Sequence, residues 1–168
     1  MGKGDHQITS SWIDSEDSIQ YECAATLEIT RSNVTFVGTG KVTTTILGGF
    51  AIENLENITF KQMTLTNTSG GCCGVFMRNA KVELFDVALT GYVSKYALLI
   101  SHTTSATTAL VATRCEFADS AYGAIVHGSL TSATFKNCVF HDNFNDGIYG
   151  SDRATIHLHG EATAIHSN

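Results

Sequence analysis

One short pattern recurs through most of this chain at a spacing of roughly two dozen residues. Each copy has three residues whose first and third members are apolar, and successive copies are 24, 24, 28 and 23 residues apart. The copies are residues 34–36, 58–60, 82–84, 110–112 and 133–135. A period of this length with short alternating segments is typical of a solenoid, in which each repeat forms one coil and packs only on its neighbours.

Two further columns follow the same period. The second has one apolar anchor in each repeat, at Leu65, Leu89, Phe117, Phe140 and Ile165. The third begins with Gly or Ala and continues with mostly apolar residues, at 49–52, 74–77, 97–100, 123–126 and 147–150. Three short strands per repeat predict an all-β fold, a right-handed single-stranded parallel β-helix of about five to six coils. The absence of proline agrees with this prediction, because proline would remove a ladder hydrogen bond from an interior strand.

The repeat also suggests domain boundaries. Residues 1–32 are less regular and are predicted to form an N-terminal coil or cap, with strands near 2–8 and 27–29 and a polar loop or helical turn at 15–18. The repeats proper are predicted over residues 33–168. The last repeat stops where its third-column strand is due, which would leave an open strand edge. We therefore expect that the chain is part of a longer solenoid or that a partner covers this end.

Composition excludes two classes of partner. The formal net charge is −6 and the ten Lys and Arg residues are scattered, which argues against nucleic-acid binding. No apolar run approaches the length of a membrane span, so membrane insertion is not expected. The first residues lack the apolar segment of a signal peptide.

The cysteines and sequons leave the compartment open. Five cysteines, an odd number, do not indicate a disulfide framework. Cys115 and Cys138 share one repeat position and are predicted to be small buried apolar residues. The pair at 72–73 lacks the spaced partners of a zinc site. Free thiols favour an intracellular protein, whereas three Asn-X-Ser/Thr sequons, beginning at residues 33, 57 and 67, would permit a secreted one.

One stretch resembles a known family. Residues 133–143, followed by 146–149, give a strand, a short polar bend, a strand ending in Asn, and then Gly-Ile. This phrase is similar to the right-handed parallel β-helices of the pectate-lyase-like superfamily, which includes carbohydrate-active enzymes, sugar-binding proteins and non-catalytic repeat proteins. Residues 155–161 also look like uncharacterised β-helix proteins of microalgae. The resemblance covers most of residues 27–168, and it implies the fold far more than an activity.

In the resembled enzymes, substrate lies along the outward face of the third column. Strand alternation points Phe76, Leu99, Ile125 and Tyr149 outward, with Arg78 two residues after Phe76. A polyuronate lyase would need carboxylates there to hold calcium, and a hydrolase would need clustered aspartates. The face is instead an apolar stripe. Three interpretations stay open: another part of the chain covers it, a protein partner or second copy docks on it, or sugar rings stack on its aromatic residues.

The turn beside that face carries the weak candidates for chemistry. Asp119 and Asp142 each follow a second-column anchor by two residues, so stacking would bring their backbones to about 4.8 Å. Two such carboxylates raise one pKa or recruit a cation. With Asp146, His127 and His141 nearby in sequence, they are candidates for acid–base catalysis, and Asp119 and Asp142 for a Ca²⁺ site. Aspartate is also an ordinary turn residue, which is the structural alternative.

A histidine pair near the C-terminus has the same ambiguity. His157 and His159 flank Leu158, so strand alternation points both imidazoles to one side, where they can bind a metal. No further ligand lies at a convincing spacing, and an outward polar face explains the pair equally simply.

These observations favour a non-catalytic β-helix module that contacts a protein or a glycan through its outward apolar strand face. No cofactor is predicted. One alternative is a carbohydrate-active enzyme, acting on a polysaccharide as a lyase, hydrolase or epimerase-like protein through the carboxylates. The other is a purely structural rod component.

Overall fold

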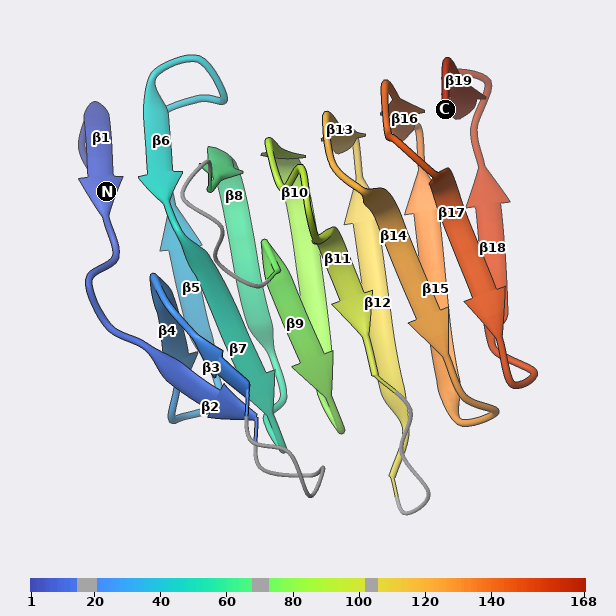
Figure 1. Cartoon of the computed structure of the whole chain (residues 1–168), viewed down its shortest axis with the longest axis horizontal. Coiled ribbons are helices and arrows are strands. Elements are labelled where there is room, and N and C mark those ends of the chain that lie inside the picture. Colours follow the sequence, from blue (N-terminus) through green and yellow to red (C-terminus); the bar gives the residue numbers. More distant parts are fainter. Residues whose placement is uncertain (15–20, 68–72, 102–105) are drawn as a thin grey trace.

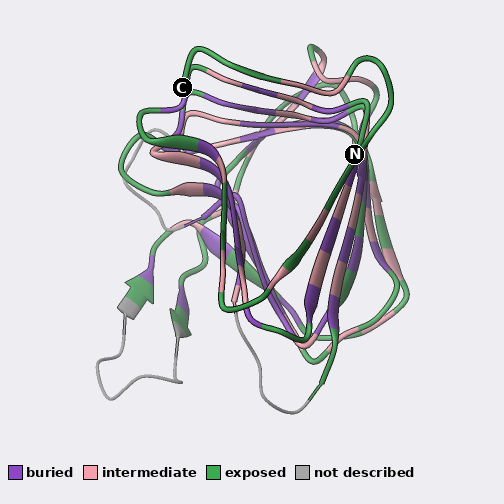
Figure 2. Cartoon of the chain, turned by 90° about the vertical axis from the view of Figure 1, so that its right-hand side faces the viewer, coloured by how far each residue is buried: buried purple, intermediate pink, exposed green. Residues whose placement is uncertain are grey.

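The chain folds as a parallel β-solenoid of about six coils, as the repeat predicts (Figure 1). The structure is a computed structural model and describes residues 1–14, 21–67, 73–101 and 106–168. These residues form strands and turns, with no helix among them. Each coil contributes one strand to each of three columns, and Figure 2 shows the resulting three-sided cross-section.

The three columns contain nearly all of the described strands. The first has β5 (Val34–Val37), β12 (Thr108–Thr113), β15 (Thr131–Lys136), β18 (Thr155–His159) and the first halves of β8 (Ile58–Thr66) and β10 (Lys81–Thr90). The second has β1 (Gly4–Gln7), β6 (Thr44–Leu47), β13 (Glu116–Ala118), β16 (Val139–His141), β19 (Ala164–His166) and the second halves of β8 and β10. The third has β4 (Thr26–Ile29), β7 (Gly49–Glu53), β9 (Val75–Arg78), β11 (Tyr96–Ile100), β14 (Tyr122–His127) and β17 (Asp146–Ser151).

The register within these columns confirms the predicted alignment. In the second column Leu65, Leu89, Phe117, Phe140 and Ile165 lie opposite one another in turn. The first-column copies and the third-column copies pair in the same way. Because every strand is parallel to the next, equivalent residues of successive coils stack directly.

The bend between the first two columns depends on one residue per coil with a left-handed backbone. Gln62 and Asp86 have φ of 56° and 53°, and the strands β8 and β10 continue through them. Arg114 and Asn137 have φ of 55° and 52° at the equivalent place, where β12 and β15 end. Positive φ is uncommon for residues other than glycine, so its recurrence in successive coils shows that the bend is part of the repeat.

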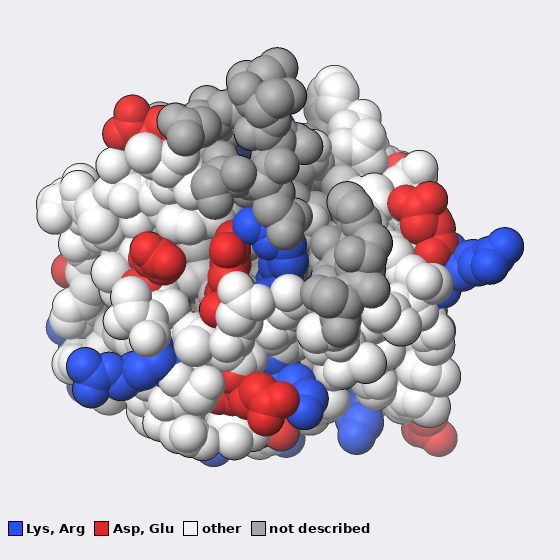
Figure 3. Space-filling model, turned by 90° about the horizontal axis from the view of Figure 1, so that it is seen from below, with Lys and Arg blue, Asp and Glu red and all other residues white. Residues whose placement is uncertain are grey.

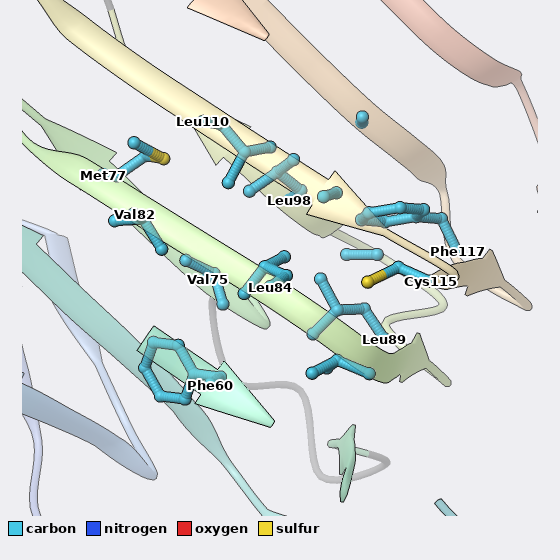
Figure 4. Packing of buried hydrophobic residues seen from close by; sticks show 14 of the residues in the cluster. Phe60, Val75, Met77, Val82, Leu84, Leu89, Leu98, Leu110, Cys115 and Phe117 are labelled. Atoms are coloured by element: carbon cyan, nitrogen blue, oxygen red, sulfur yellow. The ribbon is translucent and has the colours of Figure 1, made fainter. Parts of the chain in front are cut away.

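The inward side chains of all three columns pack into one core (Figure 4). Phe117 stacks on Phe140 with ring centroids 4.7 Å apart, so the second-column ladder is also an aromatic stack. Cys115 and Cys138 are buried within this core, as predicted, and burial raises the pKa of the Cys115 thiol. The core therefore explains why these two thiols recur at one repeat position.

The glycine that begins four of the five third-column copies has a steric reason. A Cβ atom at Gly49 would lie 1.9 Å from the carbonyl oxygen of Cys73 in the next coil. At Gly123 it would lie 2.5 Å from the carbonyl oxygen of Gly147. The turn between the second and third columns brings the backbones of successive coils this close, and a side chain would separate them.

The N-terminal region is more regular than predicted. β1 pairs with β6 and β4 pairs with β7, so the coils begin before residue 33. Between them, β2 (Trp12–Asp14) and β3 (Tyr21–Cys23) form an antiparallel pair that projects from one side of the solenoid (Figure 2). Cys23 is disulfide-bonded, which corrects the expectation that the cysteines are thiols without bridges. The predicted polar turn at 15–18 lies outside the described residues.

Candidate functional site

The predicted contact residues do share one row on the third-column sheet. Phe76 lies opposite Leu99, Leu99 opposite Ile125, and Ile125 opposite Tyr149, and Ala51 precedes them in β7. Their exposure differs sharply. Phe76 and Ile125 are each 5% exposed, Leu99 is half-buried, and Tyr149 is 44% exposed. The expectation that the whole stripe faces solvent is therefore wrong for Phe76 and Ile125.

The N-terminal end of this row lies beneath the β2–β3 pair. The Trp12 ring packs against the Phe76 ring with centroids 4.7 Å apart and planes tilted by 40°. Trp12, Phe76, Ala51 and Cys23 belong to a second buried cluster, separate from the solenoid core. Another part of the chain thus covers this end of the stripe, which was one of the three interpretations of it.

Arg78 is also engaged within the protein. Its guanidinium donates to Glu53 at 2.6 Å, from one coil to the next, and lies 5.3 Å from the centroid of the Phe76 ring. Its side chain is only 6% exposed. Arg78 therefore belongs to the covered end of the face rather than to a surface open to ligands.

Opposite charges on neighbouring coils pair elsewhere too. Lys81 Nζ lies 2.7 Å from Glu56, and Figure 3 shows acidic and basic groups side by side on the face seen from below. On that face the acidic and basic groups do not gather into a patch of one sign.

The C-terminal end of the third-column face carries an aromatic ladder. Tyr96, Tyr122 and Tyr149 come from three successive coils, with ring centroids 5.7 Å apart for the first pair and 6.3 Å for the second. The His127 ring meets the Tyr149 ring edge to face at 6.0 Å. Burial raises the pKa of Tyr96, which packs against the buried cluster that contains Trp12. The three tyrosines thus extend from that buried cluster to the exposed ring of Tyr149. We call Tyr96, Tyr122, Tyr149 and His127 the tyrosine face.

Polar groups border the exposed end of the tyrosine face. His127 Nδ1 contacts the Ser151 hydroxyl, and that hydroxyl donates to Asp152 at 3.0 Å. Asp146 is exposed and lies opposite Tyr122 in the register. A ligand over Tyr149 would therefore meet an apolar ring with hydrogen-bonding groups around it.

The second candidate region is the turn after the second column. Asp119 and Asp142 occupy equivalent positions, with φ of 49° and 53°, and both line a shallow hollow of about 250 Å³. Asp119 accepts a hydrogen bond from the Thr90 hydroxyl at 3.0 Å, and Asp142 contacts His141. Within the described part of the chain, no group of three His, Cys, Asp or Glu side chains could hold a metal ion.

His141 joins two coils through two carboxylates. Its Nδ1 lies 2.6 Å from Asp142 and its Nε2 lies 3.1 Å from Glu116. The hydrogen bond to Asp142 raises the pKa of His141, partial burial opposes the rise, and Glu116 adds to it. A protonated imidazole held between carboxylates is chemically suited to donate a proton.

A groove of about 460 Å³ adjoins this imidazole. Lys41 and Arg114 line it together with Glu116 and His141, and Lys41 Nζ lies 3.6 Å from Glu116. Arg114 in turn makes two hydrogen bonds to Asp86, at 2.8 and 2.7 Å. Each charged group of the groove thus has an oppositely charged partner within the protein.

The predicted chemical residues divide between these regions. Asp119, Asp142 and His141 lie together at the second-column turn, whereas His127 and Asp146 lie on third-column strands. Sequence analysis missed Glu116, Tyr122 and Tyr96. A signal for the tyrosines was present, since Tyr96 and Tyr122 each precede the small residue that begins the third-column copy.

In comparisons with protein-family models, curated proteins and solved structures, nothing matches this chain. The parallel solenoid is therefore established by the structure alone, and kinship with pectate-lyase-like proteins stays a hypothesis. No helix in the described residues is long and apolar enough to cross a membrane.

Proposed function

We propose that this chain is a non-catalytic β-helix binding module whose contact surface is the tyrosine face. The observation that carries this proposal is the exposed Tyr149 ring at the end of the ladder, 44% exposed beside Tyr122 and His127. Exposed aromatic rings backed by a rigid sheet lose little conformational entropy on binding and offer an apolar face with a polar edge.

A glycan suits this surface better than a protein partner. A stable protein interface covers about 800 Å² on each partner, whereas Phe76 and Ile125, two of the residues in the same row as Tyr149, are already buried. Of Phe76, Leu99, Ile125 and Tyr149 only Tyr149 is exposed, and the polar residues Ser151, Asp152 and Asp146 lie nearby on and after β17. An aromatic ring with acceptors at its rim matches a sugar, which has an apolar C–H face and peripheral hydroxyls. The resemblance to sugar-binding β-helices supports the same ligand class.

The test is a thermal-shift screen against neutral and acidic oligosaccharides, with and without Ca²⁺. A ligand at a hundredfold its Kd adds about 2.7 kcal/mol of stability, which shifts the unfolding temperature visibly. We expect a shift that Tyr149→Ser abolishes and Phe144→Ser leaves intact. Phe144 is the control because its ring is 84% exposed and lines the hollow of Asp119 and Asp142 rather than forming part of the tyrosine face.

The same screen separates the alternatives. A shift that survives Tyr149→Ser but disappears in Asp142→Asn would move the site to the second-column turn and favour the enzyme hypothesis. A screen without any shift would contradict glycan binding and leave a protein partner or a structural rod.

A further inference from the structure

Two histidines on the first-column face differ from the other described histidines. His157 and His159 lie on β18, both are exposed, and their rings are stacked with centroids 6.0 Å apart and planes inclined by 17°. Residues two apart on a strand point to the same side, so both imidazoles stand on the outward surface of the sheet. This surface belongs to the first column, whereas the tyrosine face belongs to the third.

Within the described residues, neither ring has a hydrogen-bond or ion-pair partner. His6 contacts the Gly2 carbonyl, His127 contacts Ser151, His141 is bridged by two carboxylates, and His166 lies 3.4 Å from the Ser167 hydroxyl. Among the described histidines, only the pair on β18 makes no hydrogen bond or ion pair. Their nitrogen lone pairs are therefore available to an external ligand.

From this geometry we propose that His157 and His159 chelate a borderline divalent cation of the first transition row. Neutral imidazole nitrogen is a preferred ligand of Ni²⁺, Cu²⁺ and Zn²⁺, whereas Ca²⁺ and Mg²⁺ prefer oxygen. Each nitrogen would lie about 2.1 Å from the metal, so the two donors must converge to about 3 Å. Both side chains are exposed and unbonded, so each ring can turn its edge towards the other without breaking a contact. Water would complete the coordination.

One neighbouring charge acts against this site. Lys136 lies opposite His159 in the register of β15 and β18, and its side chain is exposed. An ammonium group beside the bound cation weakens binding through like-charge repulsion. Removal of the Lys136 charge should therefore strengthen metal binding.

Isothermal titration of the whole chain with Ni²⁺ tests the proposal, followed by Cu²⁺ and Ca²⁺. We expect one Ni²⁺ site per chain, tighter binding of Cu²⁺ in keeping with the usual affinity order, and no Ca²⁺ binding at this site. His157→Gln and His159→Gln should each weaken Ni²⁺ binding by at least about tenfold, because either leaves a single protein ligand. Lys136→Gln should tighten it.

The matched control is His166→Gln, which removes an exposed histidine from the neighbouring column. Its Ni²⁺ affinity should equal that of the unaltered chain. The proposal is overturned if Ni²⁺ does not bind, if both variants on β18 bind it as well as the unaltered chain, or if the His166 variant loses the site. Circular dichroism of each variant confirms that a lost site is not a lost fold.

Discussion

The two ends of the third-column face carry residues of the same outward row, but these residues differ in their exposure to solvent. At the N-terminal end, Phe76 is buried beneath Trp12. At the C-terminal end, Tyr149 occupies the equivalent position two coils beyond Leu99 and is 44% exposed. Both residues are aromatic, both point outward, and both stand on a parallel sheet backed by the same core.

The difference is due to a segment outside the repeat. The β2–β3 pair lies between β1 and β4 in the chain, and its Trp12 shares a buried cluster with Ala51 and Phe76 that does not include Tyr149. An outward apolar row on a solenoid is therefore ambiguous by itself: the same pattern forms a second buried cluster around Phe76 and leaves the Tyr149 ring exposed. The proposed function depends on this distinction, and the predictions below test it.

The largest expected effect comes from an equivalent substitution at the two ends. Phe76→Ala removes a buried ring and should lower the free energy of unfolding by about 3–5 kcal/mol. Tyr149→Ala removes a partly exposed ring and should cost about 1 kcal/mol or less. Urea unfolding of the two variants, followed by circular dichroism, measures both values. Equal losses would mean that the two ends are not differently covered in solution.

A smaller effect should isolate the cover itself. In a double-mutant cycle of Trp12→Ala and Phe76→Ala, the coupling free energy should be about 0.5–1.5 kcal/mol, as for other packed aromatic pairs. The same cycle with Trp12 and Tyr149 should give a coupling near zero, because Tyr149 lies outside the cluster that contains Trp12. Additive losses for Trp12 and Phe76 would contradict the packing of the β2–β3 pair on the solenoid.

The repeating part of the molecule could be predicted from the sequence, whereas the packing of the non-repeating segment could not. The strands, columns and register came from the period, because stacking in a solenoid relates residues one repeat apart. The contact between Trp12 and Phe76 was not predictable in this way, since Trp12 lies outside the repeat and joins a row several coils later in sequence. Alternation correctly predicted that Phe76 points outward, but direction does not determine exposure when a non-repeating segment packs over the sheet.

The turn after the second column shows a second limit. The period placed Asp119 and Asp142 at equivalent positions, and they line one hollow. The period did not predict the contact of His141 with Glu116, because that contact depends on side-chain conformation rather than on register. Glu116 lies between Ala88 and Val139 in the register, and its contact with His141 is seen only in the structure.

The smallest predicted effect is a difference in how stability depends on pH in the two parts of the molecule. At the covered end Trp12 and Phe76 pack apolar rings together, so their contribution does not titrate. In the C-terminal coils, the raised pKa of His141 means that its protonated form is stabilised in the folded chain by Asp142 and Glu116. The centroid of the His166 ring lies 5.6 Å from that of the His141 ring, and Lys41 Nζ lies 3.6 Å from Glu116.

This pKa shift fixes the sign of the effect. The folded pKa lies above the ordinary value of 6.5, so the contribution is complete below about pH 6.5 and disappears as the pH rises through the raised pKa. The groups are partly exposed, so the loss should be below about 1 kcal/mol. Urea unfolding across this range should show stability falling with rising pH, and His141→Gln should remove that component. His166→Gln is the control, because it keeps both carboxylates on His141. A His141→Gln variant with the full pH dependence would show that the bridge between these coils does not contribute to stability.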